Sequence, residues 1–365
     1  MCRWFAYISP TEPCLLDDVL VHPPNSLSRQ VHDHYLPQLI AHNPEDLQRA
    51  DHLTTARNSV YNIDGLGVAW YTPSFSGFEN AVTGKDDDGR KGNEDEGLMP
   101  AAFKTIVVPN NDMNFKSIVR NTETKCCFAH IRAASGTPIV QTNNHPFIFG
   151  RHTFMHNGVV SNFTLIKRAV CEEMSDAAFA NIQGGTDSEH MAALYMTYLT
   201  SSGDASSFLR TYTLEQMATA MHKTVSTIIS AQLKTLGRAK AAPNSLNLCA
   251  TDGTKLIAYR FRNHGTEQPP SLYYSTKAGT TLNRKYPDRP DGKDVEGRYQ
   301  GLDVEQHGEH LIVASEPSTY KEEDWHLIGK NQCVLAESGG KFEVRDVPYR
   351  AEWDVEDPFS EVHTS

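Results

Sequence analysis

The longest predicted helices of this 365-residue chain lie between two groups of predicted strands. Apolar and β-branched residues predict the first strands at 2–8, 65–71, 101–108, 126–133 and 152–156. Helical spacing of apolar residues predicts helices near 163–174, 186–200 and 214–236, with shorter ones at 15–21, 26–41 and 113–121. Strands are predicted again at 246–251, 255–262, 272–276 and 310–314. This order favours antiparallel sheets covered by helices over a regularly alternating parallel α/β fold.

Two polar stretches interrupt the pattern, near 74–97 and 283–301. The first consists mainly of Gly, Asp, Glu, Lys and Asn, a composition that predicts a solvated, mobile insertion, and we expect the same of the second. We therefore predict one domain over 2–335, with these insertions, and a C-terminal extension over 336–365. The residues from about Trp353 are acidic, and we expect them to form a loose tail.

Charge and cysteine content exclude several classes of protein. A formal net charge of −11 argues against binding to nucleic acid or to an anionic membrane surface. No apolar run approaches the ~20 residues needed to span a bilayer, and the first residues lack the apolar core of a signal peptide. The 7 cysteines include no CxxC pair, which favours a reduced, cytoplasmic protein without a zinc site. We expect no metal and no cofactor.

A cysteine stands directly behind the initiator methionine. Its small side chain permits methionine aminopeptidase to remove Met1, and Cys2 would then carry both a thiol and a free α-amine. An α-amine has a pKa of about 7.7–8.0 and a free thiol about 8.5, so the amine can accept the thiol proton near neutral pH. Cys2 would thus hold nucleophile and base together. The alternative is an ordinary buried strand cysteine, which position alone favours.

A first motif suggests how a substrate carboxylate could be bound. Residues 128–136 (FAHIRAASG) end a strand with Arg132 next to a turn at Ser135 and Gly136. A guanidinium there can bind a carboxylate with two parallel hydrogen bonds, although a structural ion pair fits equally well. In a second motif, residues 143–147 (NNHPF), the Asn and His before the proline are held extended and can brace a neighbouring loop by hydrogen bonds, so we expect a supporting role for His145.

A third motif, residues 155–158 (MHNG), leaves a predicted strand. Asn157 can donate a side-chain N–H and Gly158 a backbone N–H, which together would form an oxyanion hole. The alternative is a type I′ turn, which Asn-Gly commonly forms.

A fourth motif, residues 184–189 (GGTDSE), begins a predicted helix. Thr186 and Glu189 match a capping box, but a cap does not require Asp187 between them. A carboxylate at that position can also receive a substrate ammonium group, and both interpretations are compatible.

Together these groups match the requirements of γ-glutamyl cleavage. Arg132 would bind the substrate α-carboxylate and Asp187 its α-ammonium. Cys2 would then attack the δ-carbonyl and form a γ-glutamyl thioester, which water or another nucleophile resolves.

In this order, the motifs resemble those of class II glutamine amidotransferases, a branch of the N-terminal nucleophile hydrolases. The resemblance covers roughly residues 2–335. The stretches MCRWFAY, DGLGVAWY and VASEP are most similar to a subgroup that includes the glutamine amidotransferase subunit of the fungal glutathione degradosome and related γ-glutamyl amidohydrolases. The resemblance implies an α+β fold, a four-layer αββα sandwich of two antiparallel sheets flanked by helices.

The resemblance also implies residue roles and partners. The catalytic residues would be Cys2, Asn157 and Gly158, the substrate-binding residues Arg132, Ser135 and Asp187, and the supporting residues His145, His156 and Thr186. Ala133 stands where relatives such as glucosamine-phosphate synthase have Trp, so larger γ-glutamyl compounds are expected to fit. The family implies a peptidase-like partner subunit for glutathione breakdown. Alternatives are a glutaminase subunit that supplies ammonia to a separate synthase, or an inactive relative that binds a partner.

Overall fold

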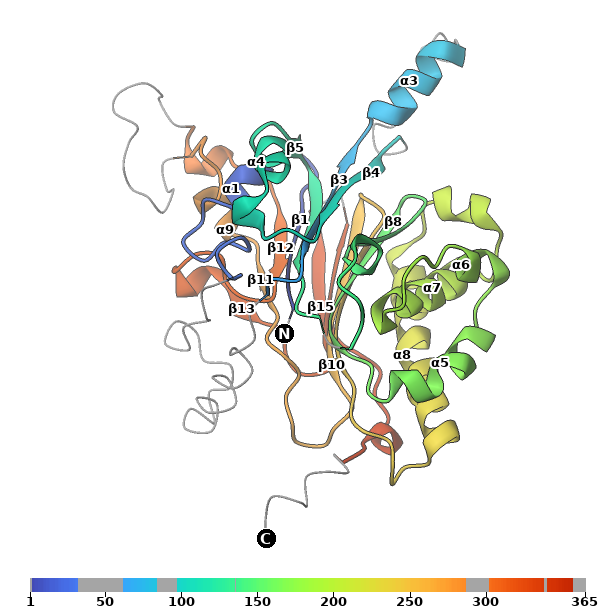
Figure 1. The fold of residues 1–365 in the computed structure, drawn as a ribbon. Helices are drawn as coiled ribbons and strands as arrows, with labels where there is room; N and C mark the ends of the chain where they lie inside the picture. Colours follow the sequence, from blue (N-terminus) through green and yellow to red (C-terminus); the bar gives the residue numbers. More distant parts are fainter. Residues whose placement is uncertain are drawn as a thin grey trace.

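A computed structural model describes residues 2–31, 62–83, 97–134, 136–286, 302–337 and 340–356. Two antiparallel sheets form its centre (Figure 1). The first has seven strands in the order β13 (His326–Leu327), β11 (Tyr273–Ser275), β12 (Leu311–Ala314), β1 (Arg3–Ile8), β6 (Cys126–Ile131), β3 (Leu66–Thr72) and β4 (Met99–Thr105). β1 therefore lies in the middle of this sheet.

The second sheet has six strands. Their order is β15 (Phe342–Asp346), β14 (Gln332–Glu337), β10 (Lys255–Arg262), β9 (Ser245–Thr251), β8 (His152–Val159) and β7 (Phe147–Phe149). A separate two-stranded ladder pairs β2 (Cys14–Leu15) with β5 (Glu123–Thr124).

Helices cover the outer face of each sheet (Figure 1). The second sheet carries α5 (Phe163–Glu172), α6 (Asp176–Ala180), α7 (Asp187–Leu199) and α8 (Leu214–Leu236), and the first carries α1 (Leu16–Leu20), α4 (Met113–Arg120) and α9 (Ala278–Thr281). α3 (Ser74–Thr83) projects from the body. Short 3-10 turns are η2 (Pro109–Asn111), η3 (Gln141–Asn143), η4 (Ala205–Leu209), η5 (Val304–Gln306), η6 (Glu322–Asp324) and η7 (Ala351–Trp353).

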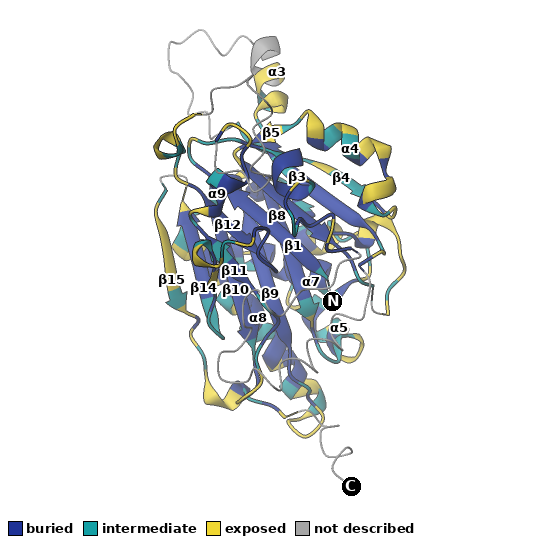
Figure 2. Ribbon diagram, turned by 90° about the vertical axis from the view of Figure 1, so that its left-hand side faces the viewer, coloured by how far each residue is buried: buried dark blue, intermediate teal, exposed yellow. Residues whose placement is uncertain are grey.

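The three apolar cores show that the molecule has four layers. Because successive strand residues face opposite sides, Phe5 and Tyr7 of β1 pack against the helices, whereas Trp4 and Ala6 pack between the sheets. A third cluster joins the second sheet to α5, α7 and α8. Figure 2 shows the central strands as buried, whereas the edge strand β15 is largely exposed. The predicted αββα sandwich is confirmed.

Local signals account for the helix ends. Thr213 and Gln216 form a complete capping box at the start of α8, and Gly237 ends that helix with a φ of +73°. α7 is buried around nearly its whole circumference, as expected for a helix packed between a sheet and other helices.

Some sequence predictions differ from the structure. The stretch 74–97 begins with helix α3, and 84–96 lie outside the described residues. Residues 26–31 of the predicted helix 26–41 form turns; the remainder, and 287–301 of the second insertion, also lie outside them. The predicted boundary at 335 falls inside β14, whose partner β15 follows it in the same sheet.

The prediction of a loose tail from Trp353 is wrong for that residue. Its ring is 4% exposed and packs against Phe261 and His222, because an indole gains more from burial in the core than from solvent. Among the described residues, no helix has both the length and the apolar character needed to cross a bilayer.

Candidate active site

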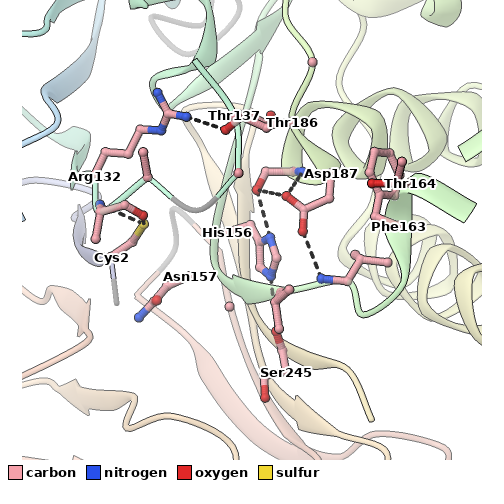
Figure 3. Close-up of a pocket in the computed structure, with 18 of the residues that line it drawn as sticks. Cys2, Arg132, Thr137, His156, Asn157, Phe163, Thr164, Thr186, Asp187 and Ser245 are labelled. Carbon is pink, nitrogen blue, oxygen red and sulfur yellow. Dashed lines mark hydrogen bonds between the residues drawn. The ribbon is translucent and has the colours of Figure 1, made fainter. Parts of the chain in front are cut away.

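The predicted site residues that the structure describes come together around one pocket of about 1030 Å³ (Figure 3). Its lining includes Cys2 and Arg132 from the first sheet and its loops, Asn157 and Gly158 from β8, and Asp187 from the start of α7. Thr186, His145 and His156 also line it. Ser135 lies outside the described residues. The pocket therefore draws its walls from both sheets.

Strand register brings Cys2 and Arg132 together. β1 pairs antiparallel with β6, and Arg3 lies opposite Ile131. Cys2 precedes Arg3 and Arg132 follows Ile131, so both residues lie at the same end of the strand pair. The backbone N–H of Ala133 donates to the Cys2 sulfur at 3.3 Å, and Arg3 Nη1 donates to the Cys2 carbonyl at 3.1 Å. Both contacts fix Cys2 just before the strand begins.

The surroundings of Cys2 act on its acidity in opposite directions. Burial raises the pKa of the Cys2 thiol. The hydrogen bond from Ala133 and the positive charges of Arg132 and Arg3 act to lower that pKa, because each stabilises the thiolate. A nearby proton acceptor is therefore needed to make this thiol an efficient nucleophile near neutral pH.

The Arg132 side chain is buried, and its hydrogen-bond partners among the described residues are neutral groups. Nη1 donates to the carbonyl of Pro138 at 3.0 Å and to Asn144 Oδ1 at 3.4 Å, and Nη2 donates to Thr137 Oγ1 at 2.6 Å. No ion pair to Arg132 is found in the described part of the chain. Burial lowers the pKa of this guanidinium, and the charges of Asp64 and Asp187 oppose that shift.

Asp187 is held at the first position of α7 by backbone donors. Its Oδ2 accepts from Val160 N at 2.9 Å, and its Oδ1 accepts from Ser188 N at 2.8 Å and from the Ser188 hydroxyl at 3.2 Å. The described residues contain no ion pair to this carboxylate either. Arg132 and Asp187 thus place a cation and an anion in the pocket lining, each oriented by neutral hydrogen-bond partners.

Only half of the predicted capping box forms at α7. Thr186 Oγ1 accepts from Glu189 N at 3.1 Å and caps the helix. The Glu189 carboxylate instead accepts from Gln183 N at 2.9 Å and Gly184 N at 2.7 Å. Glu189 therefore closes the loop before the helix and leaves the start of α7 to Asp187.

Asn157 and Gly158 lie inside β8 rather than in a type I′ turn. They pair with Asn247 and Leu246 of β9. Gly158 has a φ of +154°, and an added Cβ would lie 1.8 Å from the carbonyl of Ser245, so no other residue fits there without displacing β9. The buried Asn157 donates from Nδ2 to Ser315 Oγ at 3.4 Å.

Histidines support the site as neutral side chains. His145 is buried and stacks on His130 with ring centroids 3.9 Å apart, and burial lowers the pKa of both, to about 3 for His130. His156 contacts Ser188 Oγ through Nδ1 at 2.9 Å, and burial lowers its pKa as well. His156 thereby braces the residue that follows Asp187.

The motif at 143–147 braces the same region. Asn143 Oδ1 accepts from Gly185 N at 2.9 Å, and its Nδ2 donates to the carbonyl of Pro138 at 2.9 Å. Asn143 thus connects the loop that holds Arg132 to the loop that precedes Asp187. The hydrogen bonds that brace this loop come from Asn143, whereas the ring nitrogens of His145 have no hydrogen-bond partner in the described part of the chain.

Sequence reasoning assigned no role to two residues beside the site. Ser315 Oγ accepts from Trp4 N at 3.0 Å as well as from Asn157, and Asp64 Oδ2 accepts from Ala134 N at 2.7 Å. Both belong to stretches that carried the family resemblance, DGLG and VASEP. The family resemblance was the signal that could have identified Ser315 and Asp64, because their residue types and spacing alone do not indicate a chemical role.

Asp17, Asp18 and His22 form a cluster with the donor atoms of a cation site. However, Arg284 Nη2 lies 3.1 Å from Asp17 and 2.6 Å from Asp18, so a cation already neutralises both carboxylates. We infer no metal site from this cluster.

Similarity to known proteins was found in sequence and in fold. No family model matches the chain. In sequence it is similar to a probable glutamine amidotransferase of Saccharomyces cerevisiae, DUG3, with 28% identity over 336 residues that cover 92% of this chain and 81% of the relative.

In structure, the chain is similar to a glutamine aminotransferase class-II domain protein from Silicibacter pomeroyi. The TM-score is 0.52 at 17% identity, over 95% of this chain and 100% of that one, and this likeness concerns the fold. The chain therefore resembles the class II glutamine amidotransferases both in its sequence, over most of its length, and in its fold, as its motifs predicted.

Proposed function

We propose that the protein hydrolyses γ-glutamyl amide bonds through a thioester on Cys2. Similarity to a probable glutamine amidotransferase supports an enzyme that acts on amides. The observation that carries the finer proposal is the pair of opposite charges in the Cys2 pocket. Arg132 is buried and Asp187 is half-buried, and neither has an ionic partner among the described residues, although a buried charge is costly without one. A glutamyl head group, with its α-carboxylate and α-ammonium, supplies both.

The reaction would proceed in two steps once Met1 is removed. The α-amine of Cys2 accepts the thiol proton, and the thiolate attacks the δ-carbonyl while Asn157 Nδ2 and the Gly158 N–H stabilise the oxyanion. Collapse breaks the C–N bond, and the ammonium of Cys2 returns its proton to the leaving amine. Water, deprotonated by the same amine, then attacks the thioester and releases glutamate and the thiol.

Glutamate release from glutamine, glutathione and other γ-glutamyl amides tests this proposal. We expect Cys2→Ser to abolish hydrolysis to within assay background, because a hydroxyl is a far weaker nucleophile than a thiolate. Cys171→Ser is the matched control, since Cys171 is also partly exposed but does not line the pocket. Full activity of Cys2→Ser, or an intact mass that retains Met1 in active protein, contradicts the mechanism.

The physiological substrate is the finer part of the proposal. We propose a role in glutathione catabolism with a peptidase-like partner subunit. A pocket of about 1030 Å³ reaches the upper end of the ~300–1,000 Å³ typical of small-molecule sites, which supports a substrate larger than glutamine. Comparing kcat/KM for glutathione with that for glutamine, with and without cell extract, tests it. Preference for glutamine under both conditions contradicts this role.

A further inference from the structure

We propose that Glu316 is a positioning residue for the nucleophile and acts on Cys2 through Arg3. The proposal rests on the proposed role of Cys2 in γ-glutamyl hydrolysis. Glu316 directly follows Ser315 just beyond the end of β12, and it does not line the pocket. It therefore has no direct contact with a substrate in that pocket, and any effect on the reaction must pass through its neighbours.

A chain of contacts connects the Glu316 carboxylate to the nucleophilic residue. Arg3 Nε lies 3.3 Å from Glu316 Oε1, and Arg3 Nη1 donates to the carbonyl oxygen of Cys2 at 3.1 Å. The hydroxyl of Ser271 donates to the same Oε1 at 3.2 Å and fixes the carboxylate from the other side. One guanidinium is thus shared between a buried acid and the backbone of Cys2.

The burial of this pair argues for a specific function. Glu316 is 2% exposed and Arg3 7% exposed. Burial raises the pKa of Glu316 to about 7, which reflects the cost of keeping a carboxylate there. A buried ion pair of this kind is often replaceable by apolar residues without loss of stability, so stability alone does not account for it. A role in orienting the Cys2 backbone does account for the buried pair.

The nucleophile needs such an anchor because it precedes the strand. β1 begins at Arg3, one residue after Cys2. In the mature protein, Cys2 would be the terminal residue, and a chain end frays unless it is tied down. The Ala133 N–H holds the sulfur and Arg3 holds the carbonyl, so together they fix both ends of the Cys2 residue.

The neighbouring residue supports the same interpretation. Ser315 Oγ accepts from Trp4 N of β1 at 3.0 Å and from Asn157 Nδ2 of β8 at 3.4 Å. The nucleophile and the oxyanion donor lie on different sheets, so their relative position depends on contacts that cross between sheets. The dipeptide Ser315-Glu316 provides such contacts to both.

The test compares Glu316→Gln with the wild-type protein in two assays. The first is steady-state glutamate release from glutamine, for which we expect kcat to fall by roughly 10- to 100-fold, because small misplacements of a reacting group cost about this much. KM should stay within about twofold, since the Arg132 and Asp187 contacts are unchanged.

The second assay measures alkylation of Cys2 by iodoacetamide and needs no substrate. Peptide mass spectrometry separates Cys2 from the other cysteines. We expect alkylation about three- to tenfold slower in Glu316→Gln, because a loosened Cys2 loses the Ala133 hydrogen bond that favours its thiolate. This assay keeps the positioning role distinct from the proposed function. Slower alkylation with no hydrolysis in the wild type overturns the proposed function and supports the role of Glu316.

Asp18→Asn is the matched control. It removes the charge of another buried carboxylate paired with an arginine, Arg284, outside the pocket, and should leave kcat and alkylation unchanged. Glu316→Asp should recover part of both rates. Should Glu316→Gln fail to fold, Arg3→Lys replaces it, because an amine cannot bridge Glu316 and the Cys2 carbonyl as a guanidinium does. Wild-type rates in either folded variant overturn the proposal.

Discussion

The two walls of the pocket hold opposite charges by different means. On the first-sheet side, the Arg132 guanidinium donates to carbonyl and side-chain oxygens of the loop that follows β6. On the second-sheet side, the Asp187 carboxylate accepts from two backbone N–H groups and a neighbouring hydroxyl at the start of α7. Both are oriented by neutral groups, so each charge stays available for a ligand of opposite sign.

This difference shows how close in sequence the groups that orient each charge lie to the charged residue itself. The three donors to Asp187 come from residues 160 and 188, one of them its direct neighbour. The acceptors for Arg132 come from residues up to Asn144, and Asn143 then ties that loop to Gly185. The orientation of the Asp187 carboxylate therefore depends mainly on the start of α7, whereas the orientation of the Arg132 guanidinium depends on an irregular loop. The following variants test each wall.

The largest expected effect is on the second-sheet wall, at Asn157. Asn157→Ala removes a proposed oxyanion donor, so kcat for glutamine should fall by about 10²–10³-fold with little change in KM. Asn181→Ala is the control, because the Asn181 amide also donates a hydrogen bond, to the backbone carbonyl of Ile148, but lies outside the pocket. Steady-state kinetics measures both. A kcat for Asn157→Ala within twofold of wild type would remove Asn157 from the mechanism.

On the first-sheet side, Glu316 makes stability depend on pH. Its pKa is raised from 4.5 to about 7 in the folded protein, so the folded state retains a proton that the unfolded state releases between these values. Stability from this group is fully present below pH 4.5 and is lost as pH rises through about 7, by on the order of 3 kcal/mol at most.

Urea unfolding of wild type and Glu316→Gln across this pH range measures that loss. The difference in unfolding free energy, wild type minus variant, should decrease from pH 4.5 to pH 7 and then level off. Using a difference removes the opposite trend of His130 and His145, whose lowered pKa values favour folding at higher pH. A difference that does not vary with pH would show that the Glu316 carboxyl titrates normally.

The comparison of the two charges is sharpened by a substrate that lacks one of them. Asp187→Asn should raise KM for glutamine by about 10- to 100-fold, which corresponds to the free energy of one charge-assisted hydrogen bond. Arg132→Lys should also raise KM for glutamine. Glutaramate keeps the carboxylate but lacks the α-ammonium. With it, Asp187→Asn should cause no further loss, whereas Arg132→Lys should. Equal defects with both substrates would contradict the separate assignments.

Much of the fold followed from patterns within single elements. The strand predicted at 2–8 and the helix predicted at 214–236 correspond to β1 and α8, because periodicity acts over a few residues. Helix α3 and the burial of Trp353 were not predicted. From composition, the α3 residues were expected to belong to a mobile insertion and Trp353 to a loose tail. The helix and the buried indole became apparent only in the folded structure.

The sequence alone determined which chemical groups the site contains: a thiol at position 2, a guanidinium at 132, an amide at 157 and a carboxylate at 187. The tertiary structure decided how they meet. Register between β1 and β6 places Cys2 beside Arg132, and pairing of β8 with β9 puts Asn157 in a strand rather than a turn. It also decided that Glu316 reaches Cys2 through Arg3. The β1–β6 and β8–β9 pairings and the Arg3–Glu316 contact join residues more than 80 positions apart, and contacts of that separation form only when the sheets assemble.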